Sequence, residues 1–578
     1  MDADLSLDAG AGPRAAGVAV AGPAEDALRA WVASARADLL AVRERVDALN
    51  VFPVADSDTG TNLYLTFARG AQEVDGVVRG AGAGDVAAAL VRGTLLGARG
   101  NSGAILAEYL RGLARAVAED EPATVDGAAA PDGAGGLDVG RLVDAFAAAA
   151  RGARGAVQDP VAGTVLSAAD AAARGAREVL AAGAHVPRAV DVTAGALRAA
   201  QEETARSTGK LDVLRRSGVL DAGALGLCVV LAALHRVLGG EVSEADGMLG
   251  SVGGVRVGTG NGTATGTADA QACVVVPHAA APEEAAGGEF EVMFVLRAPA
   301  PVDDDVARGL RADLAALGDS VVVTGGAGTW QAHVHTDEPA RAVAAGRRRA
   351  RTVRGAVRQA GVRSVLGGDA HAAGQSRTGI VVVTSAPGLA PEYARAGAVV
   401  LVLEPGAVAE PDDVARAVVD ARAGQVLVLP GRALGAQGFG ARLAALVDGE
   451  PLVRGRVDVL DAPTDLHAVA ALAALQTSGD GPEGPDATAV MRVAAAAVRA
   501  GAADLRGVPP HRLAGRLRAL VADVVGPSTE VVTVLRGRRV PGRADTLVED
   551  AVGETAPGAE VVVIASGRDD AGVEVGAE

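Results

Sequence analysis

A glycine- and threonine-rich stretch at about residues 249–271 separates two parts of the chain that differ in their apolar pattern. Before it, apolar residues recur every three or four positions, as they do from Glu25 to Asn50. After it, short valine-rich runs alternate with helical segments. The first pattern is typical of α-helices and the second of α/β layers. Because a linker of this composition is flexible, the sequence predicts an all-α region followed by separate α/β domains.

These patterns divide the chain into five predicted segments. They are a disordered tail at 1–22, an all-α domain at 23–240 with a surface insertion at 119–137, a linker at 241–288, a small α/β middle domain at 289–366 and an α/β C-terminal domain at 378–578. A second glycine- and alanine-rich linker, at 367–377, joins the last two. The chain is therefore predicted to be multidomain.

The two α/β domains contain recognisable strand and helix candidates. In the middle domain, strands are expected at Phe290–Leu296 and Ser320–Thr324 around a helix over Val302–Leu317. Arg347–Arg363 is expected to be a helix with a solvated, arginine-rich face. In the C-terminal domain, one largely parallel sheet is expected from the apolar runs Ile380–Thr384, Val399–Leu403, Val426–Leu429, Val531–Leu535 and Val561–Ile564.

Composition excludes several classes of function. The chain has 54 Lys+Arg against 71 Asp+Glu, a formal charge of −17, which argues against nucleic acid as a partner because phosphates are bound by cations. Its longest apolar run, near Leu227–Leu234, is far shorter than the roughly 20 residues of a membrane span. Cys228 and Cys273 are too few for a disulfide framework, and Met1–Ser6 lacks the pattern of a signal peptide. The expected location is the cytoplasm.

The chain has a single lysine, Lys210, and this excludes two kinds of ATP site. A P-loop needs a lysine followed by serine or threonine, whereas Leu211 follows here. A protein-kinase fold needs a strand lysine that pairs with the ATP phosphates. Any ATP site must therefore hold phosphates with metal, backbone N–H groups and arginine.

The segment Asn50–Asn62, NVFPVADSDTGTN, places Asp56 and Asp58 one residue apart in a loop after a helix. Two carboxylates at this spacing suit a hard cation such as Mg²⁺, which prefers oxygen ligands. The alternative is a turn in which an aspartate caps the next helix. An EF-hand is excluded because its fifth and twelfth positions fall on Gly60 and Phe67.

Three further glycine-containing loops precede helical segments: Gly97–Gly103 (GARGNSG), the turn at Gly163 and Thr164, and Ser217–Gly226 with Asp221. A glycine-rich turn at a helix N-terminus offers free N–H groups and a favourable dipole to an anion. Each loop alone is more often an ordinary helix cap. Together, in one all-α domain, they indicate a nucleotide site at one end of a helix bundle.

These motifs occur in the order and spacing of a known family. The segments Leu49–Asn62, Gly97–Gly103, Pro160–Leu166 and Gly218–Gly223 resemble the nucleotide-binding L domain of dihydroxyacetone kinases, as found in FakA-type proteins, which bind ATP in bacterial fatty acid kinase. The resemblance continues through His333–Asp337 (HVHTD) and a DegV-like C-terminal region. It implies a helical barrel with ATP at one mouth, a small α/β middle domain and an α/β DegV-like C-terminal domain.

The resemblance also assigns roles to individual residues. Asp56 and Asp58 match the catalytic, Mg²⁺-binding carboxylates, and Asn50 lies where a third ligand is expected. The positions that match phosphate-contacting turns or close over the nucleotide are Thr59, Gly60, Asn62, Gly100, Asn101, Ser102, Gly103, Thr164, Asp221 and Gly223. Ser57 and Ala224 depart from the glycines of the family pattern but leave both aspartates in place.

In the middle domain, family members often pair a cysteine with the His-x-His motif in a zinc site. Here Glu291 takes the position of that cysteine, beside His333 and His335. Carboxylate and imidazole both bind zinc, so these three residues form a candidate Zn site. The alternative is that the histidines lie on one face of a strand and hydrogen-bond to neighbours.

The family reaction implies transfer of phosphate from ATP, with Mg²⁺, to a fatty acid carboxylate held by a separate fatty-acid-binding carrier protein, and a homodimer. Two alternatives stay open. One is a kinase for a small polyol such as dihydroxyacetone, although no histidine-bearing substrate domain is evident. The other is a non-catalytic regulator that senses nucleotide.

Overall fold

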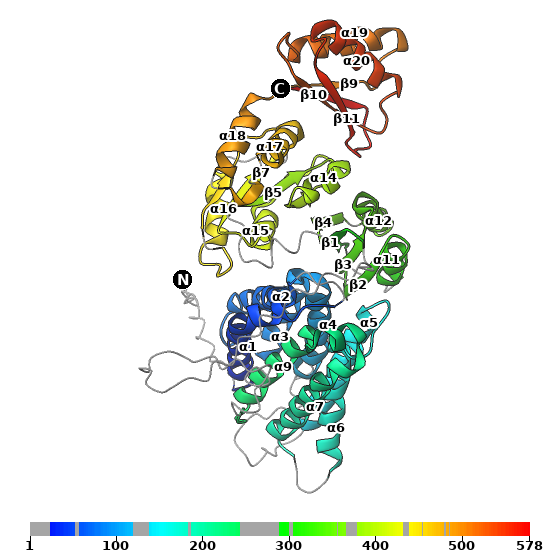
Figure 1. Ribbon diagram of the computed structural model, residues 1–578. Helices are drawn as coiled ribbons and strands as arrows, with labels where there is room; N and C mark the ends of the chain where they lie inside the picture. The colour runs from blue at the N-terminus through cyan, green and yellow to red at the C-terminus, as the bar shows by residue number, and fades with distance from the viewer. Residues whose placement is uncertain are drawn as a thin grey trace, which may run out of the picture.

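The computed structural model describes residues 23–52, 57–118, 138–182, 187–242, 288–299, 305–354, 356–365, 378–431, 438–453, 455–478, 481–484 and 486–578. The expected tail at 1–22, the insertion at 119–137 and most of both linkers lie outside these residues. The described residues form a helical domain, a broad sheet layer and a small second sheet, stacked one above the other (Figure 1).

The described residues of the N-terminal domain form helices joined by loops, as predicted. Its helices are α1 (Pro23–Ala48), α2 (Thr59–Asp75), α3 (Ala83–Gly97), α4 (Gly100–Ala118), α5 (Val139–Ala156), α6 (Val165–Ala181), α7 (Ala189–Lys210), α8 (Asp212–Ser217) and α9 (Ala222–Val237). Most consecutive helices pack in pairs, and α1 also contacts α9, which closes the domain on itself. Among the described residues, no helix is long and apolar enough to cross a membrane.

Small residues set the spacing of these helices. A Cβ atom added at Gly112 of α4 would lie 2.3 Å from the Cα atom of Ala149 on α5, so the two backbones touch at this crossing. The core around it is rich in alanine, with few large side chains such as Trp31, Phe67 and Phe146. Because interiors are packed to crystal-like density, an alanine core requires such short interhelical distances.

The second part of the chain forms an eight-stranded sheet in the order β2-β3-β1-β4-β6-β5-β7-β8. Its elements are β1 (Phe290–Arg297), α11 (Asp305–Ala315), β2 (Asp319–Gly326), β3 (Thr329–Thr336), α12 (Pro339–Thr352), β4 (Ala356–Ser364), β5 (Thr378–Thr384), α14 (Ala390–Arg395), β6 (Ala398–Val402), α15 (Pro411–Asp420), β7 (Gln425–Leu429), α16 (Phe439–Val447), β8 (Val457–Val459), α17 (Asp465–Thr477) and α18 (Ala487–Ala497). The expected middle and C-terminal domains are joined, because β4 pairs antiparallel with β6. Strands β6, β5, β7 and β8 are parallel.

The prediction of one helix over Arg347–Arg363 was wrong in its second half. Helix α12 ends at Thr352, and Ala356–Ser364 forms strand β4 between β1 and β6. Arginine is a good helix former, so local preference favoured the helix. Pairing along the whole of β1, with Val357 and Val362 buried, overrides that preference.

Residues 499–578 form a separate sheet rather than part of the first, which corrects the expectation of a single, largely parallel C-terminal sheet. The elements are β9 (Arg499–Asp504), α19 (Pro510–Val524), β10 (Val531–Arg536), α20 (Arg543–Thr555), β11 (Glu560–Ala565) and β12 (Gly572–Ala577). The order is β11-β10-β12-β9, and only β10 and β11 are parallel. The apolar runs predicted β10 and β11 but carried no information about which strands pair.

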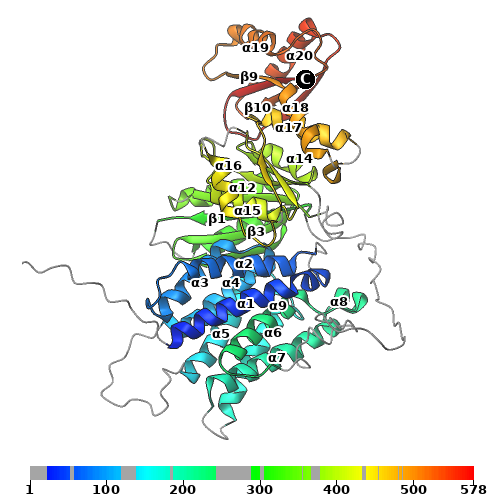
Figure 2. The same ribbon diagram turned by 90° about the vertical axis from the view of Figure 1, so that its left-hand side faces the viewer.

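The sheet layer lies directly on the part of the helical domain that contains α2, α3 and α4 (Figure 2). The side chain of Gln331 on β3 donates to the carbonyl of Ala98, and Arg416 on α15 donates to the same oxygen at 2.7 Å and to the Leu96 carbonyl at 2.6 Å. Arg99 forms an ion pair with Asp420 at the end of α15. These bonds fix the turn between α3 and α4 against the sheet.

The contact at Gly112 provides a test of the packing. Gly112→Ala should lower the free energy of unfolding by about 1–3 kcal/mol, because the new methyl group meets backbone atoms that cannot rotate away. The matched control is Gly155→Ala on α5, where an added Cβ atom meets nothing within 4 Å. There, alanine should be neutral or stabilising by up to about 1 kcal/mol. Calorimetric unfolding of both variants checks this, and equal effects would contradict it.

Candidate functional site

The N-terminus of α2 begins with Asp58, one of the two expected metal-binding carboxylates. Asp58 is buried, with 4% of its surface exposed, and its side chain makes no capping hydrogen bond to α2. The carboxylate is therefore not used as a helix cap, the alternative that the sequence left open for it. Asp56 lies within 53–56, outside the described residues.

The carboxylate of Asp58 is held by two arginines that come from the sheet layer. Arg363 on β4 forms an ion pair with Oδ2, and an Nη atom of Arg422, in the turn after α15, lies 3.4 Å from the same oxygen. Burial by itself raises the pKa of Asp58, but the charges of Arg363 and Arg422 outweigh burial and hold that pKa below its ordinary value. Asp58 is therefore ionised at neutral pH.

The residues after Asp58 are held close to neighbouring elements. Asn62 accepts from Arg422 at 3.3 Å through its Oδ1 atom, and the Oγ1 atom of Thr59 lies 3.5 Å from the hydroxyl of Ser102. Gly60 is required by the close approach of α1, since an added Cβ atom would lie 2.2 Å from the Arg43 carbonyl. The first turn of α2 is thus pinned in place.

Asn50 lies in the short loop after α1 and is buried, with 4% of its surface exposed. On the last turns of the same helix, Asp47 accepts from the N–H and the hydroxyl of Thr61, at 2.8 and 2.7 Å. This pair holds the end of α1 against the start of α2.

The loop at Gly97–Gly103 enters α4 next to the first turn of α2. Gly100 has φ +56, in the left-handed region, and an added Cβ atom would lie 2.5 Å from Nδ2 of Asn62. A Cβ atom at Gly103 would lie 2.2 Å from the Thr66 hydroxyl. Asn101 keeps a buried Oδ1 atom that has no hydrogen-bond partner among the described residues. The two helix N-termini are therefore in contact and contain an unsatisfied polar atom.

The remaining predicted residues lie at the starts of α6 and α9. Thr164 caps α6, and Asp221 caps α9 by accepting from Ala224 N–H at 2.8 Å. Ser102, Val165 and Gly223 line the same narrow apolar space, which places these helix ends beside α4. The structure thus brings all four glycine-containing motifs to one end of the helical domain.

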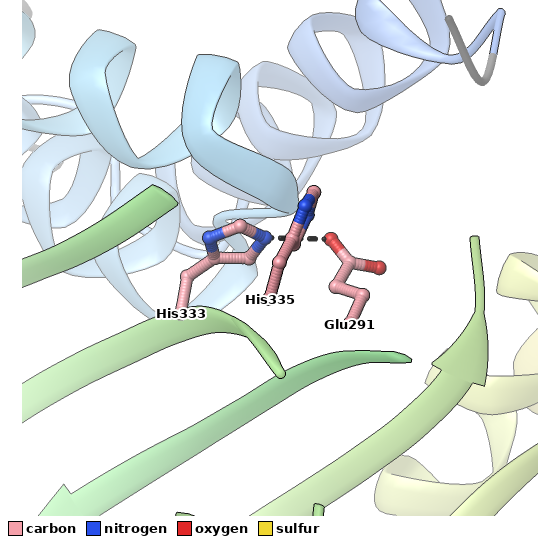
Figure 3. Close-up of side chains that lie close together, drawn as sticks. All are labelled: Glu291, His333 and His335. Atoms are coloured by element: carbon pink, nitrogen blue, oxygen red, sulfur yellow. Dashed lines mark hydrogen bonds and ion pairs between the residues drawn. The ribbon is translucent and has the colours of Figure 1, made fainter. Parts of the chain in front are cut away.

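The three residues of the candidate zinc site lie on adjacent strands of the sheet. Glu291 on β1 pairs with His335 on β3, and His333 is two residues away on the same face. Their side chains point from the sheet toward the helices (Figure 3). Nε2 of His333 lies 2.9 Å from Oε1 of Glu291, and the three groups can offer ligand atoms within 4.8 Å of one another.

In this cluster, hydrogen bonds account for one histidine, whereas the other has a nitrogen that suits a zinc ion. His333 also bonds to the carbonyl of Ser320 at 3.0 Å, so hydrogen bonding accounts for this ring. In contrast, Nδ1 of His335 is buried without a partner among the described residues. Burial, reinforced by His333, lowers the pKa of His335 to about 3, so its imidazole is neutral and available as a ligand. One carboxylate and two imidazoles are a known catalytic zinc set.

The two clusters form one continuous polar site. Arg363 bridges them, because it forms ion pairs with both Asp58 and Glu291. Gly100 N–H donates to the sulfur of Met293 on β1 at 3.3 Å, so the α4 loop touches the same face of the sheet. Against the effect of burial, Arg363 and then His333 hold the pKa of Glu291 well below its ordinary value.

Arg363, Arg422 and Met293 also belong to the site and were not predicted from the sequence. Arg363 was assigned to a solvated helix, whereas it lies on a strand that pairs with β1, opposite Glu291. The only available signal was the alternation of Val362 with its neighbours. Arg422 lies in a turn with no motif, so nothing in the sequence indicated its position.

Two parts of the chain match models of known protein families. The DAK2 domain matches residues 53–236, and the middle domain of FakA-like fatty acid kinase proteins matches residues 287–358. Among curated proteins, an uncharacterized protein of Staphylococcus epidermidis is 34% identical over 200 residues, which are 35% of this chain and 33% of that protein. An uncharacterized protein of Staphylococcus aureus is 32% identical over 200 residues, with the same coverage. The chain thus spans about a third of the length of the curated relatives that it matches.

Two solved structures are also similar to parts of the chain. A dihydroxyacetone kinase from C. freundii in complex with AMP-PNP and Mg²⁺ has a TM-score of 0.26 and 20% identity, covering 41% of this chain and 38% of that one. A DegV family protein from Corynebacterium glutamicum has a TM-score of 0.27 and 14% identity, covering 35% of this chain and 96% of that one. At such scores neither likeness bears on the activity.

The buried carboxyl of Asp221 gives a prediction on stability and pH. Burial raises the pKa of Asp221 to about 6. Since its unfolded value is near 3.9, the folded protein binds more protons between about pH 4 and 6, and stability falls as the pH rises through this range. Asp221→Asn keeps the cap acceptor and removes the charge. Its gain in unfolding free energy over the wild type should be near zero at pH 4 and reach about 1–3 kcal/mol at pH 8.

Urea unfolding at several pH values measures this difference. Asp138→Asn, at the exposed cap of α5, controls for the general effect of removing one negative charge. A gain at Asp221 that is the same at every pH would show that burial of the charge is not its cause.

Proposed function

Because the chain has the FakA-type organisation, a DAK2 domain followed by a FakA-like middle domain, we propose that it is an ATP-dependent kinase. Its acceptor is the carboxylate of a fatty acid held by a separate carrier protein, and the product is an acyl phosphate. The observation that supports this most is the position of Asp58, a buried ionised carboxylate where the N-termini of α2 and α4 meet.

The chemistry places few demands on the protein. A carboxylate oxygen of the acceptor attacks the γ-phosphorus, the bond from that phosphorus to the β,γ-bridging oxygen breaks, and ADP leaves. The acceptor is already ionised at pH 7, since model carboxyl groups have pKa values near 4, so no general base is needed. What remains is to position the reactants and to neutralise charge on the transferring group.

In this proposal the residues that match the family motifs bind the metal, bind the phosphates or close over the nucleotide. Asp56, Asp58 and Asn50 would hold Mg²⁺, which would supply positive charge to the phosphate groups when bound. The N–H groups of Thr59, Gly60, Asn101 and Ser102, at the starts of α2 and α4, would hold phosphate oxygens. The N–H groups of Asn62, Gly100 and Gly103 already have acceptors, so these residues would line the same turns. Thr164, Asp221 and Gly223 would close over the nucleotide from α6 and α9.

The partner is proposed to be a fatty-acid-binding carrier that docks on the α/β part of the chain, in the cytoplasm. A homodimer is the family-based expectation. The apolar space at this end of the helical domain, lined by residues such as Leu63, Tyr109 and Leu227, is narrow and too small for an acyl chain. A separate carrier supplies the lipid in this proposal.

The central prediction concerns Asp58. Asp58→Ala should reduce turnover at least about 100-fold. The reason is that the metal, which would stabilise charge on the transferring phosphoryl group, loses a ligand. The measurement is ADP and acyl phosphate formed from ATP, Mg²⁺ and fatty-acid-loaded carrier from the same cell. Asp75→Ala, at the exposed far end of α2, is the matched control and should keep full activity.

Other outcomes would favour the other functions. Turnover that remains in Asp58→Ala would refute the metal role. Turnover with dihydroxyacetone but not with the carrier would identify a small-polyol kinase. Binding of ATP without transfer to either acceptor would favour a nucleotide sensor.

We also propose that Glu291, His333 and His335 bind Zn²⁺. Cobalt, which replaces zinc in such sites, should give visible absorption when added to the wild type, because the neutral ring of His335 offers a free Nδ1 atom. His335→Ala should lose this absorption, whereas His511→Ala, at an exposed position on α19, should keep it. An unchanged spectrum in His335→Ala would contradict the assignment.

A further inference from the structure

Two arginines from the sheet layer converge on the proposed phosphoryl-transfer site. Arg363 comes from β4, and Arg422 from the turn between α15 and β7, further along the chain. Both reach the carboxylate of Asp58, and Arg422 also donates to Asn62. A site built on helix N-termini thus receives two guanidinium groups from a different part of the chain.

Both arginines bind the same oxygen of Asp58. The ion pair of Arg363 and the 3.4 Å contact of Arg422 are made to Oδ2. Among the described residues, no hydrogen bond is made to Oδ1. Asp58 can therefore bind a metal ion through Oδ1 while both guanidinium groups remain beside it, so metal and arginine need not compete.

Arg422 is held in place at a cost. It has φ +50, in the left-handed region that residues other than glycine rarely adopt, so its backbone is strained. Its Nε atom is buried and has no hydrogen-bond partner among the described residues. The neighbouring Asp420 is tied to Arg99 on the α4 loop. An arginine with an unsatisfied donor is therefore fixed beside the site.

A phosphoryl-transfer site needs positively charged side chains, and the one lysine of the helical domain is already paired. The only lysine, Lys210, forms an ion pair with Glu203 on the same helix, α7. Phosphoryl transfer concentrates negative charge on the transferred group, and enzymes neutralise it with metal and with lysine or arginine. Arginine has the planar fork that matches phosphate oxygens.

We propose that Arg363 and Arg422 contact the transferring phosphoryl group, so that the sheet layer provides the cations for a reaction sited on the helical domain. This rests on the proposed kinase function. When ATP binds, Nη groups that now contact Oδ2 of Asp58 would donate to oxygens of the γ-phosphate. Transfer then requires the sheet to be docked on the helical domain as it is here.

A transition-state analogue tests this without knowledge of the acceptor. The probe is MgADP with aluminium fluoride, which mimics the transferring group, and its affinity for the full chain is measured by calorimetry beside that of MgADP alone. Arg363→Ala and Arg422→Ala should each weaken binding of the analogue about 30-fold or more, while the affinity for MgADP changes less than about 3-fold. Arg422→Ala serves even if Arg363→Ala, which leaves Glu291 buried without its cation, fails to fold.

The matched control is Arg311→Ala. This arginine also crosses from the sheet layer to the helical domain, but it donates to the Gly155 carbonyl at 3.2 Å, away from Asp58. The Arg311→Ala variant should bind the analogue as tightly as the wild type does. An equal loss in all three variants would show that the arginines only hold the domains together and would overturn the proposal.

Two other results would also overturn it. Unchanged analogue binding in Arg422→Ala would show that this group does not contact the phosphoryl position. Tighter binding of MgADP and faster turnover in the variants would show that the arginines block the metal instead. Failure of the kinase function itself is distinguishable, because the wild type would then bind the analogue no more tightly than MgADP alone.

Discussion

The ion pairs of Arg363 are the contact on which the arrangement of the molecule depends. One guanidinium group joins Asp58 of the helical domain to Glu291 of the sheet, and both carboxylates are nearly fully buried. A buried carboxylate is strongly unfavourable unless it is paired, and Arg363 pairs with both acids, beside Arg422 at Asp58 and His333 at Glu291. The interface is thus specified by charge as well as by shape.

The rest of the interface orients this contact. The α4 loop is fixed to the sheet by Gln331 and Arg416, which both bind the Ala98 carbonyl, and Gly325 N–H donates to Glu108 of α4 at 2.8 Å. With the loop held, the N-termini of α2 and α4 face the arginines. Helix ends provide N–H donors in fixed directions, and a sheet provides rigid positions for side chains. The two kinds of structure therefore contribute different parts of one site.

The parts of the site that the sequence predicted depend on short stretches of neighbouring residues. The loops around Asp58, Gly100, Thr164 and Asp221 could be found because each begins a helix, a feature that depends on a few neighbouring residues. Their meeting at one end of the helical domain was expected from the occurrence of several such loops in one all-α domain and from the family resemblance. The roles of these residues stay predictions, and Asp56 lies outside the described residues.

The features that were missed depend on contacts far apart in the sequence. Strand β4 was predicted as helix because arginine-rich segments favour helices, whereas pairing with β1 and β6 decides its structure. The same pairing joins the two α/β regions into one sheet and aims Arg363 at Asp58, 305 residues away. The separate sheet of β9 to β12 was missed for a similar reason, since apolar runs do not specify their partners.

A double-mutant cycle between Asp58→Asn and Arg422→Ala tests most directly whether helical domain and sheet form one site. The quantity is the free energy of binding of MgADP with aluminium fluoride to the wild type, the two single variants and the double variant. A single shared site predicts that the effects of the two changes are coupled by more than about 1 kcal/mol. Effects that add to within about 0.5 kcal/mol would contradict it, because residues that act on the same group do not behave independently.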